Sequence, residues 1–212
     1  MTLTREEEIL LEQGKLLPLM EDFYTIQGEG YNTGKPAYFI RLGGCDMGCS
    51  WCDVKESWNA DLHPLTPTEQ MIERAASHPA KAAVITGGEP VMYNLEYLTS
   101  GLKKKGIKTF IETSGVKPLT GKWDWVCLSP KKGSLPVDDY YAFASELKVI
   151  ICNERDLTWA ELNAKRVHDK CLLYLQPEWS VADEVLPVII EYAKRNPKWN
   201  VSLQSHKYMS IP

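Results

Sequence analysis

The 212-residue sequence lacks any apolar stretch long enough to cross a membrane, and it lacks an excess of positive charge. Its 24 Lys and Arg stand against 28 Asp and Glu, which gives no electrostatic reason to expect nucleic-acid binding. The first residues also lack the apolar core of a secretory signal, because Glu6, Glu7 and Glu8 stand where that core would lie. We therefore expect a cytoplasmic protein with neither a membrane nor a nucleic-acid partner.

The six cysteines give little reason to expect disulfides, because thiols stay reduced in the cytoplasm. Cys127, Cys152 and Cys171 each lie in or beside an apolar run, where a buried thiol behaves as a small hydrophobe. The other three cysteines are clustered in one short segment. That segment carries the first chemical signal in the chain.

Short apolar segments alternate with amphipathic ones along a chain that is long enough to form one domain, residues 1–212. Strands are predicted over 39–42, 82–86, 108–112, 125–128, 146–151, 172–175 and 199–203. Helices are predicted over 68–77, 95–105, 158–166 and 181–195. This alternation implies parallel strands joined by right-handed crossovers, hence an α/β layer or a barrel. A complete eightfold barrel typically needs about 250 residues, so the chain is too short for one.

Polar or glycine-rich segments follow six of the predicted strands. They read GGCDMGCSWC, GGEP, TSG, SPK, QPEW and QSHKYMSIP in chain order. Because the carboxyl ends of parallel strands share one edge, these segments predict a large continuous ligand site.

The spacing Cys45-x3-Cys49-x2-Cys52 places three thiolates on one loop. A 4Fe–4S cluster ordinarily takes four cysteines, so three leave one iron open to an external ligand. Structural zinc needs a fourth ligand at similar reach, and His63 lies beyond the loop while the other histidines are far along the chain. A cluster is therefore favoured over zinc.

This segment, with Trp51 before the last cysteine, resembles the signature of the radical S-adenosylmethionine (SAM) family. Gly87-Gly88-Glu89-Pro90 is similar to that family's GGEP motif, which meets the methionine part of SAM. Adjacent glycines let the backbone approach a ligand closely, and Glu89 offers a carboxylate to a protonated amine. The resemblance implies a partial TIM-like barrel with outer helices. It also implies that SAM binds the open iron and is cleaved reductively to a 5′-deoxyadenosyl radical.

A narrower resemblance, from about Glu21 to Pro212, is to the 7-carboxy-7-deazaguanine synthase family. The matching motifs are Thr25-Ile26-Gln27-Gly28-Glu29-Gly30, Phe39-Ile40-Arg41, Glu112-Thr113-Ser114-Gly115, Ser129-Pro130-Lys131, Glu146-Leu147-Lys148, Gln176-Pro177 and Gln204-x-His206-Lys207-x4-Pro212. Enzymes of this family are carbon–nitrogen lyases of queuosine and 7-deazapurine biosynthesis. They convert 6-carboxy-5,6,7,8-tetrahydropterin to 7-carboxy-7-deazaguanine with loss of ammonia, and SAM is regenerated.

The resemblance also implies roles for individual residues. The cluster ligands would be Cys45, Cys49 and Cys52. The SAM-binding residues would be Gly88, Glu89, Ser114, Ser129, Pro130, Lys131, Gln176, Pro177, Glu178 and Trp179. The pterin-binding residues would be Ile26, Gln27, Gly28, Arg41, Thr86 and Pro212. Arg41 suits the substrate carboxylate because a guanidinium binds an acid through two donors, although a surface ion pair is the alternative for this residue. The carboxylate of Pro212 is expected to meet the donors of the pterin.

The sequence departs from the family at Asp53-Val54, where relatives typically have Asp followed by Thr or Ser, whose hydroxyl binds Mg2+. Valine has no oxygen with which to ligate a cation. We expect either that Asp53 takes over the contact, which suits the preference of Mg2+ for carboxylates and waters, or that the metal is held differently.

Two alternatives remain open. A glycyl-radical enzyme activase shares the cysteine spacing and a GGEP-like motif, but it gives no reason for the QGEG and C-terminal motifs. A non-catalytic iron–sulfur electron carrier or regulator leaves GGEP, SPK and Arg41 unexplained. The expected partners are the pterin, a flavodoxin- or ferredoxin-type reductant and a second copy of the chain in a homodimer.

Overall fold

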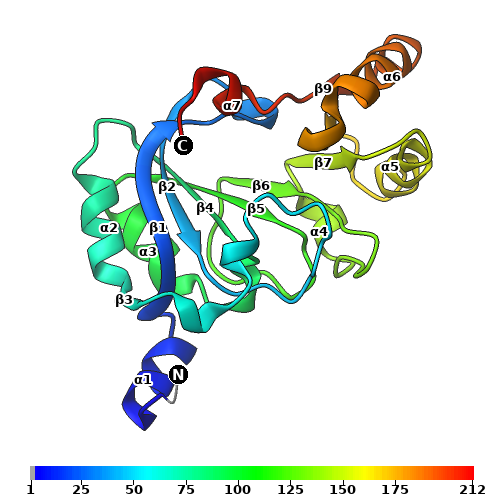
Figure 1. The fold of residues 1–212 in the computed structure, drawn as a ribbon. Coiled ribbons are helices and arrows are strands. Elements are labelled where there is room, and N and C mark those ends of the chain that lie inside the picture. The colour runs from blue at the N-terminus through cyan, green and yellow to red at the C-terminus, as the bar shows by residue number, and fades with distance from the viewer. Residues whose placement is uncertain (1–2) are drawn as a thin grey trace.

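The strands line up in one open sheet (Figure 1). In the computed structural model, which describes residues 3–212, the strand order is β3-β1-β2-β4-β5-β6-β7-β8-β9. From β2 to β9 all neighbours are parallel, whereas β1 is antiparallel to both β2 and β3. The edge strands β3 and β9 do not pair with each other, so the sheet curves without closing. The partial barrel expected from the sequence is confirmed.

The strands are β1 (Leu16–Ile26), β2 (Pro36–Leu42), β3 (Leu65–Pro67), β4 (Ala82–Gly87), β5 (Lys108–Thr113), β6 (Trp125–Leu128), β7 (Glu146–Ile151), β8 (Leu172–Pro177) and β9 (Trp199–Val201). The α-helices are α1 (Arg5–Glu12), α2 (Thr68–Ala76), α3 (Glu96–Lys104), α4 (Tyr140–Phe143), α5 (Asp156–Ala164), α6 (Ala182–Arg195) and α7 (Ser205–Met209). Short 3-10 turns are η1 (Gly30–Asn32), η2 (Lys55–Ser57), η3 (Ala60–Leu62), η4 (Pro90–Met92) and η5 (Trp179–Val181).

Alternation along each strand separates a structural face from a functional one. On β7, Leu147, Val149 and Ile151 are fully buried in the main core beneath the helices. Lys148 and Ile150 point the other way and line a pocket on the inner face. The same strands therefore carry both the core and the site.

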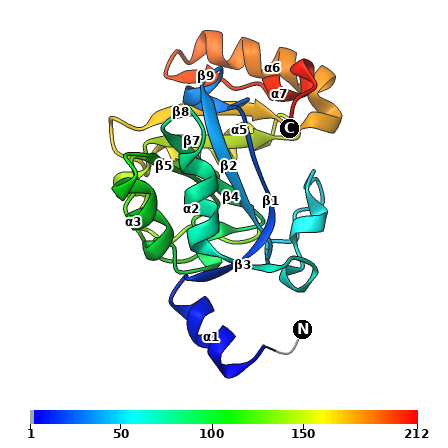
Figure 2. The same ribbon diagram turned by 90° about the vertical axis from the view of Figure 1, so that its left-hand side faces the viewer.

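The helices cover the outer face of the sheet (Figure 2). Helix α3 packs on β5, α5 on β7, and α6 on β8 and β9, while α2 packs on α3. Buried residues recur at helical spacing, as with Met71 and Ala75 on α2 or Val185 and Ile189 on α6. Within residues 3–212 no helix combines the length and the apolar character that a membrane span requires.

Several elements were not predicted. They are α1, β1, β3, α4 and α7, and β9 ends at Val201 instead of residue 203. Strand β1 contains Pro18, and its pairing with β2 shifts between Leu19 and Glu21. Such an irregularity resets the alternation of buried and exposed residues, so no simple period of two marks this strand.

The segment after β9 folds back onto the end of β1. Ser205 N–H donates to the Gly28 carbonyl at 2.9 Å, and α7 follows directly. The C-terminal residues consequently lie beside the end of β1 and the start of β2, opposite to helix α1 (Figure 1).

Candidate active site

One pocket on the inner face of the sheet collects nearly all the residues that the sequence singled out. It is lined by Cys45, Cys49, Cys52, Asp53, Gly88, Glu89, Ser114, Ser129, Lys131, Gln176, Pro177, Glu178 and Trp179, and by Ile26, Gln27, Gly28, Arg41, Thr86 and Pro212. Of the predicted residues only Pro130 does not line it. Apolar walls that the sequence analysis did not assign come from Phe23, Phe39, Met47, Trp58 and Ile150.

The cysteine loop after β2 is fixed by main-chain hydrogen bonds to the segments around it. Gly44 N–H donates to the Ser57 carbonyl at 2.6 Å, and Cys45 N–H donates to the Trp58 carbonyl at 3.0 Å. Gly44 has φ +99° and Gly48 has φ +58°, and residues other than glycine rarely adopt such backbone angles. The backbone conformation of the cysteine loop is therefore fixed where it lines the pocket.

The three thiols are free and half-buried, as a cluster site requires. Burial raises the pKa of Cys45 and Cys49, and the Lys131 charge opposes this for the Cys49 pKa. Over residues 3–212, no three His, Cys, Asp or Glu side chains converge closely enough to hold a single metal ion. The three thiols lie on one loop and line the same pocket, which suits a cluster in which each thiolate binds a different iron.

The GGEP turn is locked to this loop. Gly88 N–H donates to the Leu42 carbonyl at 2.9 Å, and Glu89 N–H donates to the Gly44 carbonyl at 2.8 Å. A Cβ on Gly88 would lie 2.2 Å from the Gly44 carbonyl oxygen and 2.9 Å from Cys45 Cβ. Only glycine permits this approach of the two loops.

The Glu89 carboxylate, 2 % exposed, is already bound by protein donors. Thr113 Oγ1 and Val91 N–H donate to Oε1, and Ser114 donates to Oε2 through both its N–H and its hydroxyl. A carboxylate has about four acceptor positions, and all are in use. The Glu89 carboxylate thus ties the turn after β4 to the end of β5.

At the exits of β6 and β8, polar groups are held in place by the protein itself. Lys131 Nζ donates to both the carbonyl and the hydroxyl of Ser129 and lies 5.3 Å from the centre of the Trp51 ring. Gln176 accepts from the Ser202 hydroxyl at 2.7 Å. Trp179 is 41 % exposed at the rim of the pocket.

At the opposite side of the pocket, Arg41 makes an ion pair. Its Nε lies 2.7 Å from Glu21 Oε1, and the Arg41 side chain is 19 % exposed. Arg41 therefore lines the pocket while it pairs with a carboxylate of the neighbouring strand.

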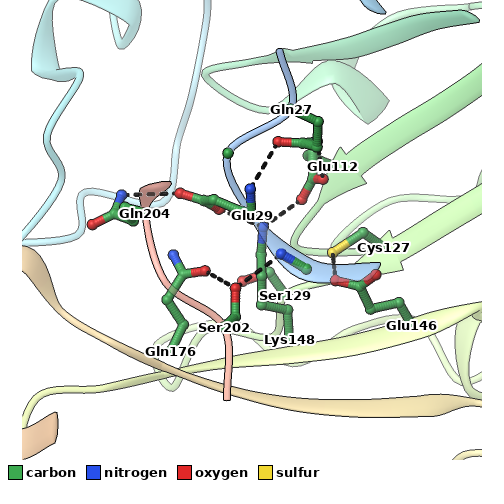
Figure 3. A network of polar contacts seen from close by, with 12 residues as sticks. Gln27, Glu29, Glu112, Cys127, Ser129, Glu146, Lys148, Gln176, Ser202 and Gln204 are labelled. Carbon is green, nitrogen blue, oxygen red and sulfur yellow. Dashed lines mark hydrogen bonds and ion pairs between the residues drawn. The ribbon is translucent and has the colours of Figure 1, made fainter. Parts of the chain in front are cut away.

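A charge network that the sequence analysis did not assign forms part of the pocket wall (Figure 3). Lys148, 4 % exposed, bridges Glu29 at 2.6 Å and Glu112 at 2.8 Å. Burial would raise the pKa of Glu29, but the Lys148 charge prevails and lowers that pKa to about 2. The sequence does contain a signal, because a lysine within an otherwise apolar strand must find partners when it is buried.

The residues at the expected Mg2+ position do not fit a divalent cation. Asp53 Oδ2 is 2.9 Å from Lys207 Nζ, and Gln204 Nε2 donates to the same oxygen at 3.4 Å. Val54 lines the pocket without an oxygen to offer. The Lys207 ammonium is thus ion-paired with the carboxylate that was expected to bind the metal.

The geometry agrees with what known proteins show. Residues 39–129 match the model of the radical SAM superfamily. The 7-carboxy-7-deazaguanine synthase of Flavobacterium psychrophilum is 57% identical over 210 residues, covering 99% of this chain and 100% of that protein. The synthase of the same name from a Synechocystis species is 43% identical, covering 92% and 93%. This chain belongs to the 7-carboxy-7-deazaguanine synthase family of radical SAM enzymes.

Solved structures agree with this assignment. QueE from Escherichia coli superposes with a TM-score of 0.81 at 33% sequence identity, covering 96% of this chain and 100% of that one. Radical SAM enzymes use a 4Fe–4S cluster and SAM, and the free cysteine triplet and the GGEP turn are the residues here that fit them. The family acts on a small molecule, for which the rest of the pocket provides walls.

Proposed function

We propose that this enzyme converts 6-carboxy-5,6,7,8-tetrahydropterin to 7-carboxy-7-deazaguanine with release of ammonia, as a carbon–nitrogen lyase of queuosine and 7-deazapurine biosynthesis. One observation carries the proposal. The cysteine loop, the GGEP turn and a set of amide and guanidinium groups line the same pocket, supplied by the ends of different strands. When bound, the cluster and SAM supply the reductive cleavage that starts hydrogen-atom abstraction; the protein orients the substrate and excludes water.

The SAM side of the pocket is proposed to run from the GGEP turn to the exit of β8. The main chain of Gly88 and Glu89 takes the amine, and Lys131 with Ser129 supplies polar contacts. Ser114, Pro130 and the segment Gln176, Pro177, Glu178 and Trp179 complete this side, with Pro130 shaping the loop from behind the pocket wall. Cys45, Cys49 and Cys52 hold the cluster.

The pterin side is proposed to lie between the loop after β1 and the Arg41 end of β2. Arg41 exchanges Glu21 for the substrate carboxylate, which a guanidinium binds through two donors. Gln27 offers an amide that now donates to Glu112 at 3.4 Å, and this suits the mixed donors and acceptors of a pyrimidine edge. Ile26, Gly28, Thr86 and Pro212 complete the walls.

For Mg2+ we derive no step, because Asp53 is ion-paired and Val54 has no ligand atom. The remaining partners are proposals on chemical grounds. A flavodoxin- or ferredoxin-type protein supplies the electron. The cytoplasm is the compartment, because its thiols stay reduced. A homodimer is proposed because the strands β3 and β9 end the sheet unpaired.

The test is anaerobic reconstitution followed by incubation with SAM, dithionite and the carboxypterin. We expect one 4Fe–4S cluster per chain and formation of the deazapurine, with SAM recovered. Alanine at Cys45, Cys49 or Cys52 should remove the cluster, whereas Cys152→Ser and Cys171→Ser should retain its iron content. An electron carrier would release no 5′-deoxyadenosine. A glycyl-radical activase would cleave SAM but leave the pterin unchanged, and that result would refute the proposed reaction.

A further inference from the structure

We propose that Glu146 and Cys127 form a proton path that joins the substrate pocket, at Glu112, to a second hollow on the outer surface of the protein. The path rests on the proposed function in one respect, namely that the reaction consumes a proton. Neither Glu146 nor Cys127 lines the substrate pocket, and the chemistry above gives them no task.

The three groups form a row across three adjacent strands. In the ladder, Glu112 of β5 is the partner of Cys127 of β6, and Cys127 is the partner of Glu146 of β7. Paired residues of neighbouring strands point to the same face, so their side chains follow one another. The Cys127 thiol donates to Glu146 Oε1 at 3.5 Å (Figure 3).

The inner end of the row opens into the pocket. Glu112 lines the pocket and its side chain is 23% exposed, whereas Cys127 is fully buried. Glu112 accepts from Gln27 Nε2 and from Lys148 Nζ. A proton that reaches Glu112 is therefore at the surface which a substrate would touch.

The outer end lies under two stacked aromatic rings. The Glu146 Oε2 atom accepts from Tyr31 N–H at 3.0 Å and from Trp125 Nε1 at 3.3 Å. The two rings stack with centres 4.8 Å apart and line a second hollow together with His168 and Lys170. A Cβ on Gly30 would lie 2.0 Å from Glu146 Oε1, so glycine here makes room for the carboxylate.

The arrangement of charges favours Glu146 as the carboxylate that retains a proton. Three carboxylates, Glu29, Glu112 and Glu146, lie around the buried cation Lys148, which forms ion pairs with the first two. Within residues 3–212 the hydrogen-bond donors to Glu146 are uncharged, and Glu146 is 2 % exposed. An ionised carboxylate in that position would be costly.

The groups around Glu146 reinforce this. Burial and the Glu112 charge raise the pKa of Glu146 and the Lys148 charge opposes them, with a net result of about 7. Burial and the Glu112 charge also raise the pKa of Cys127. The titratable or charged groups that face Glu146 are Glu112 on β5, Cys127 on β6, Lys148 on β7, Cys171 and Tyr174 at β8, and Tyr31 with Glu29 before β2.

The proposed reaction consumes a proton. Loss of ammonia breaks a carbon–nitrogen bond, and the bonding electron pair stays on nitrogen. The carbon skeleton requires no net oxidant or reductant. Because an amine is protonated at neutral pH, release as ammonium takes up one proton per turnover. Glu112 delivers that proton to the departing nitrogen, Cys127 passes it on from Glu146, and Glu146 regains it from the outer hollow.

The experiment uses the reconstituted enzyme with SAM, reductant and carboxypterin, and four variants. Glu146→Gln keeps the shape of the side chain but cannot release a proton. Cys127→Ser retains a group that relays protons, whereas Cys127→Ala does not. Glu161→Gln, at the surface ion pair with Lys198, is the matched carboxylate-to-amide control. Substrate affinity and kcat are measured across pH, and the carboxylic acid stretch of Glu146 is followed by infrared difference spectroscopy.

In the wild type kcat should fall as pH rises through the Glu146 pKa, together with the infrared band. Glu146→Gln and Cys127→Ala should lower kcat at least about tenfold, with substrate affinity retained and this pH dependence lost, whereas Cys127→Ser should keep most of the rate.

The path is refuted by an unchanged pH profile of kcat in Glu146→Gln, by equal losses of kcat in the two Cys127 variants, or by a wild type that lacks the infrared band of a protonated Glu146. Should Glu146→Gln not fold, the Cys127 pair and the wild-type spectrum still decide. A wild type that makes no deazapurine refutes the proposed function instead.

Discussion

At the scale of single residues, the ion pair between Arg41 and Glu21 creates a competition. If Arg41 binds the substrate carboxylate, Glu21 must first be displaced. Glu21→Gln should therefore tighten carboxypterin binding by about twofold to fivefold, because exposed ion pairs are worth roughly 0.2–1 kcal/mol. Arg41→Lys should weaken it, because an ammonium lacks the planar fork. Isothermal titration measures both. Equal affinity in all three proteins would place the substrate carboxylate elsewhere.

Val54 leads to a second prediction at the scale of single residues. With no oxygen at position 54 and Lys207 on Asp53, substrate binding and turnover should respond little to added Mg2+ or to a chelator specific for divalent cations. The double variant Val54→Thr with Lys207→Met restores a hydroxyl and frees the carboxylate, so it should gain Mg2+-dependent substrate binding. Lys207→Met alone is the control. A wild type whose substrate affinity depends strongly on Mg2+ would contradict this account.

The sequence located the pocket at residue level better than it assigned tasks. The cysteines, the GGEP turn and Arg41 were predicted because each has a local pattern that carries its chemistry. The network of Lys148 with Glu29 and Glu112 was not, since its members lie on three separate segments and meet only after folding. The hydrogen bonds of Thr113 and Ser114 to the Glu89 carboxylate were likewise not predicted, because they form only after folding.

At the scale of elements, α7 depends on one glycine. A Cβ on Gly28 would lie 2.1 Å from His206 Nδ1, and Ser205 N–H donates to the Gly28 carbonyl. Gly28→Ala should therefore displace α7 and weaken carboxypterin binding at least about tenfold, while SAM binding changes little, because a shift of an ångström at a site is costly. Gly133→Ala is a suitable control, since a Cβ added at Gly133 would meet no described atom within 4 Å apart from its chain neighbours. Equal loss of both ligands would indicate general unfolding instead.

The parallel strands and long helices were predictable, and the elements at the two ends of the sheet were not. Strands β4 to β8 are short apolar runs between turns, a pattern that reports burial on both faces. Helix α7 is only five residues long, and it is held by its contact with the loop after β1. Long-range docking of this kind leaves no periodic trace in the sequence.

At the scale of the whole molecule, Lys148 links stability to pH. The pKa of Glu29 is lowered from 4.5 to about 2, so its ion pair stabilises the fold above the ordinary value and is lost as pH falls towards about 2. Lys148→Met leaves buried carboxylates unpaired and should destabilise the protein by roughly 3–5 kcal/mol at neutral pH. The pKa of Glu29 should then be raised, because burial is no longer opposed by the Lys148 charge, so the variant should gain stability on acidification while the wild type loses it.

Urea denaturation at several pH values between about 3 and about 7 measures these opposite slopes. Lys198→Met removes a half-exposed ion pair with Glu161 and should cost about 1 kcal/mol or less. Parallel slopes in the wild type and Lys148→Met would show that Lys148 does not control the ionisation of its neighbours.

The alternation of strands and helices predicted an α/β layer or a barrel, and chain length argued against a complete eightfold barrel. The partial barrel itself was implied by the family resemblance. What could not be foreseen is how the sheet is extended at one end, because the antiparallel strands β1 and β3 obey no crossover rule.

The division of each strand into a core face and a pocket face makes this scaffold open to redesign. Along β7 the residues that pack under the helices alternate with Lys148 and Ile150, which line the pocket. Laboratory selection for new substrates can therefore vary apolar pocket walls such as Ile150 and Phe23 while the packing that sustains the fold is left intact. The charged members of the pocket face are the exception, because any exchange there has to be made in matched pairs.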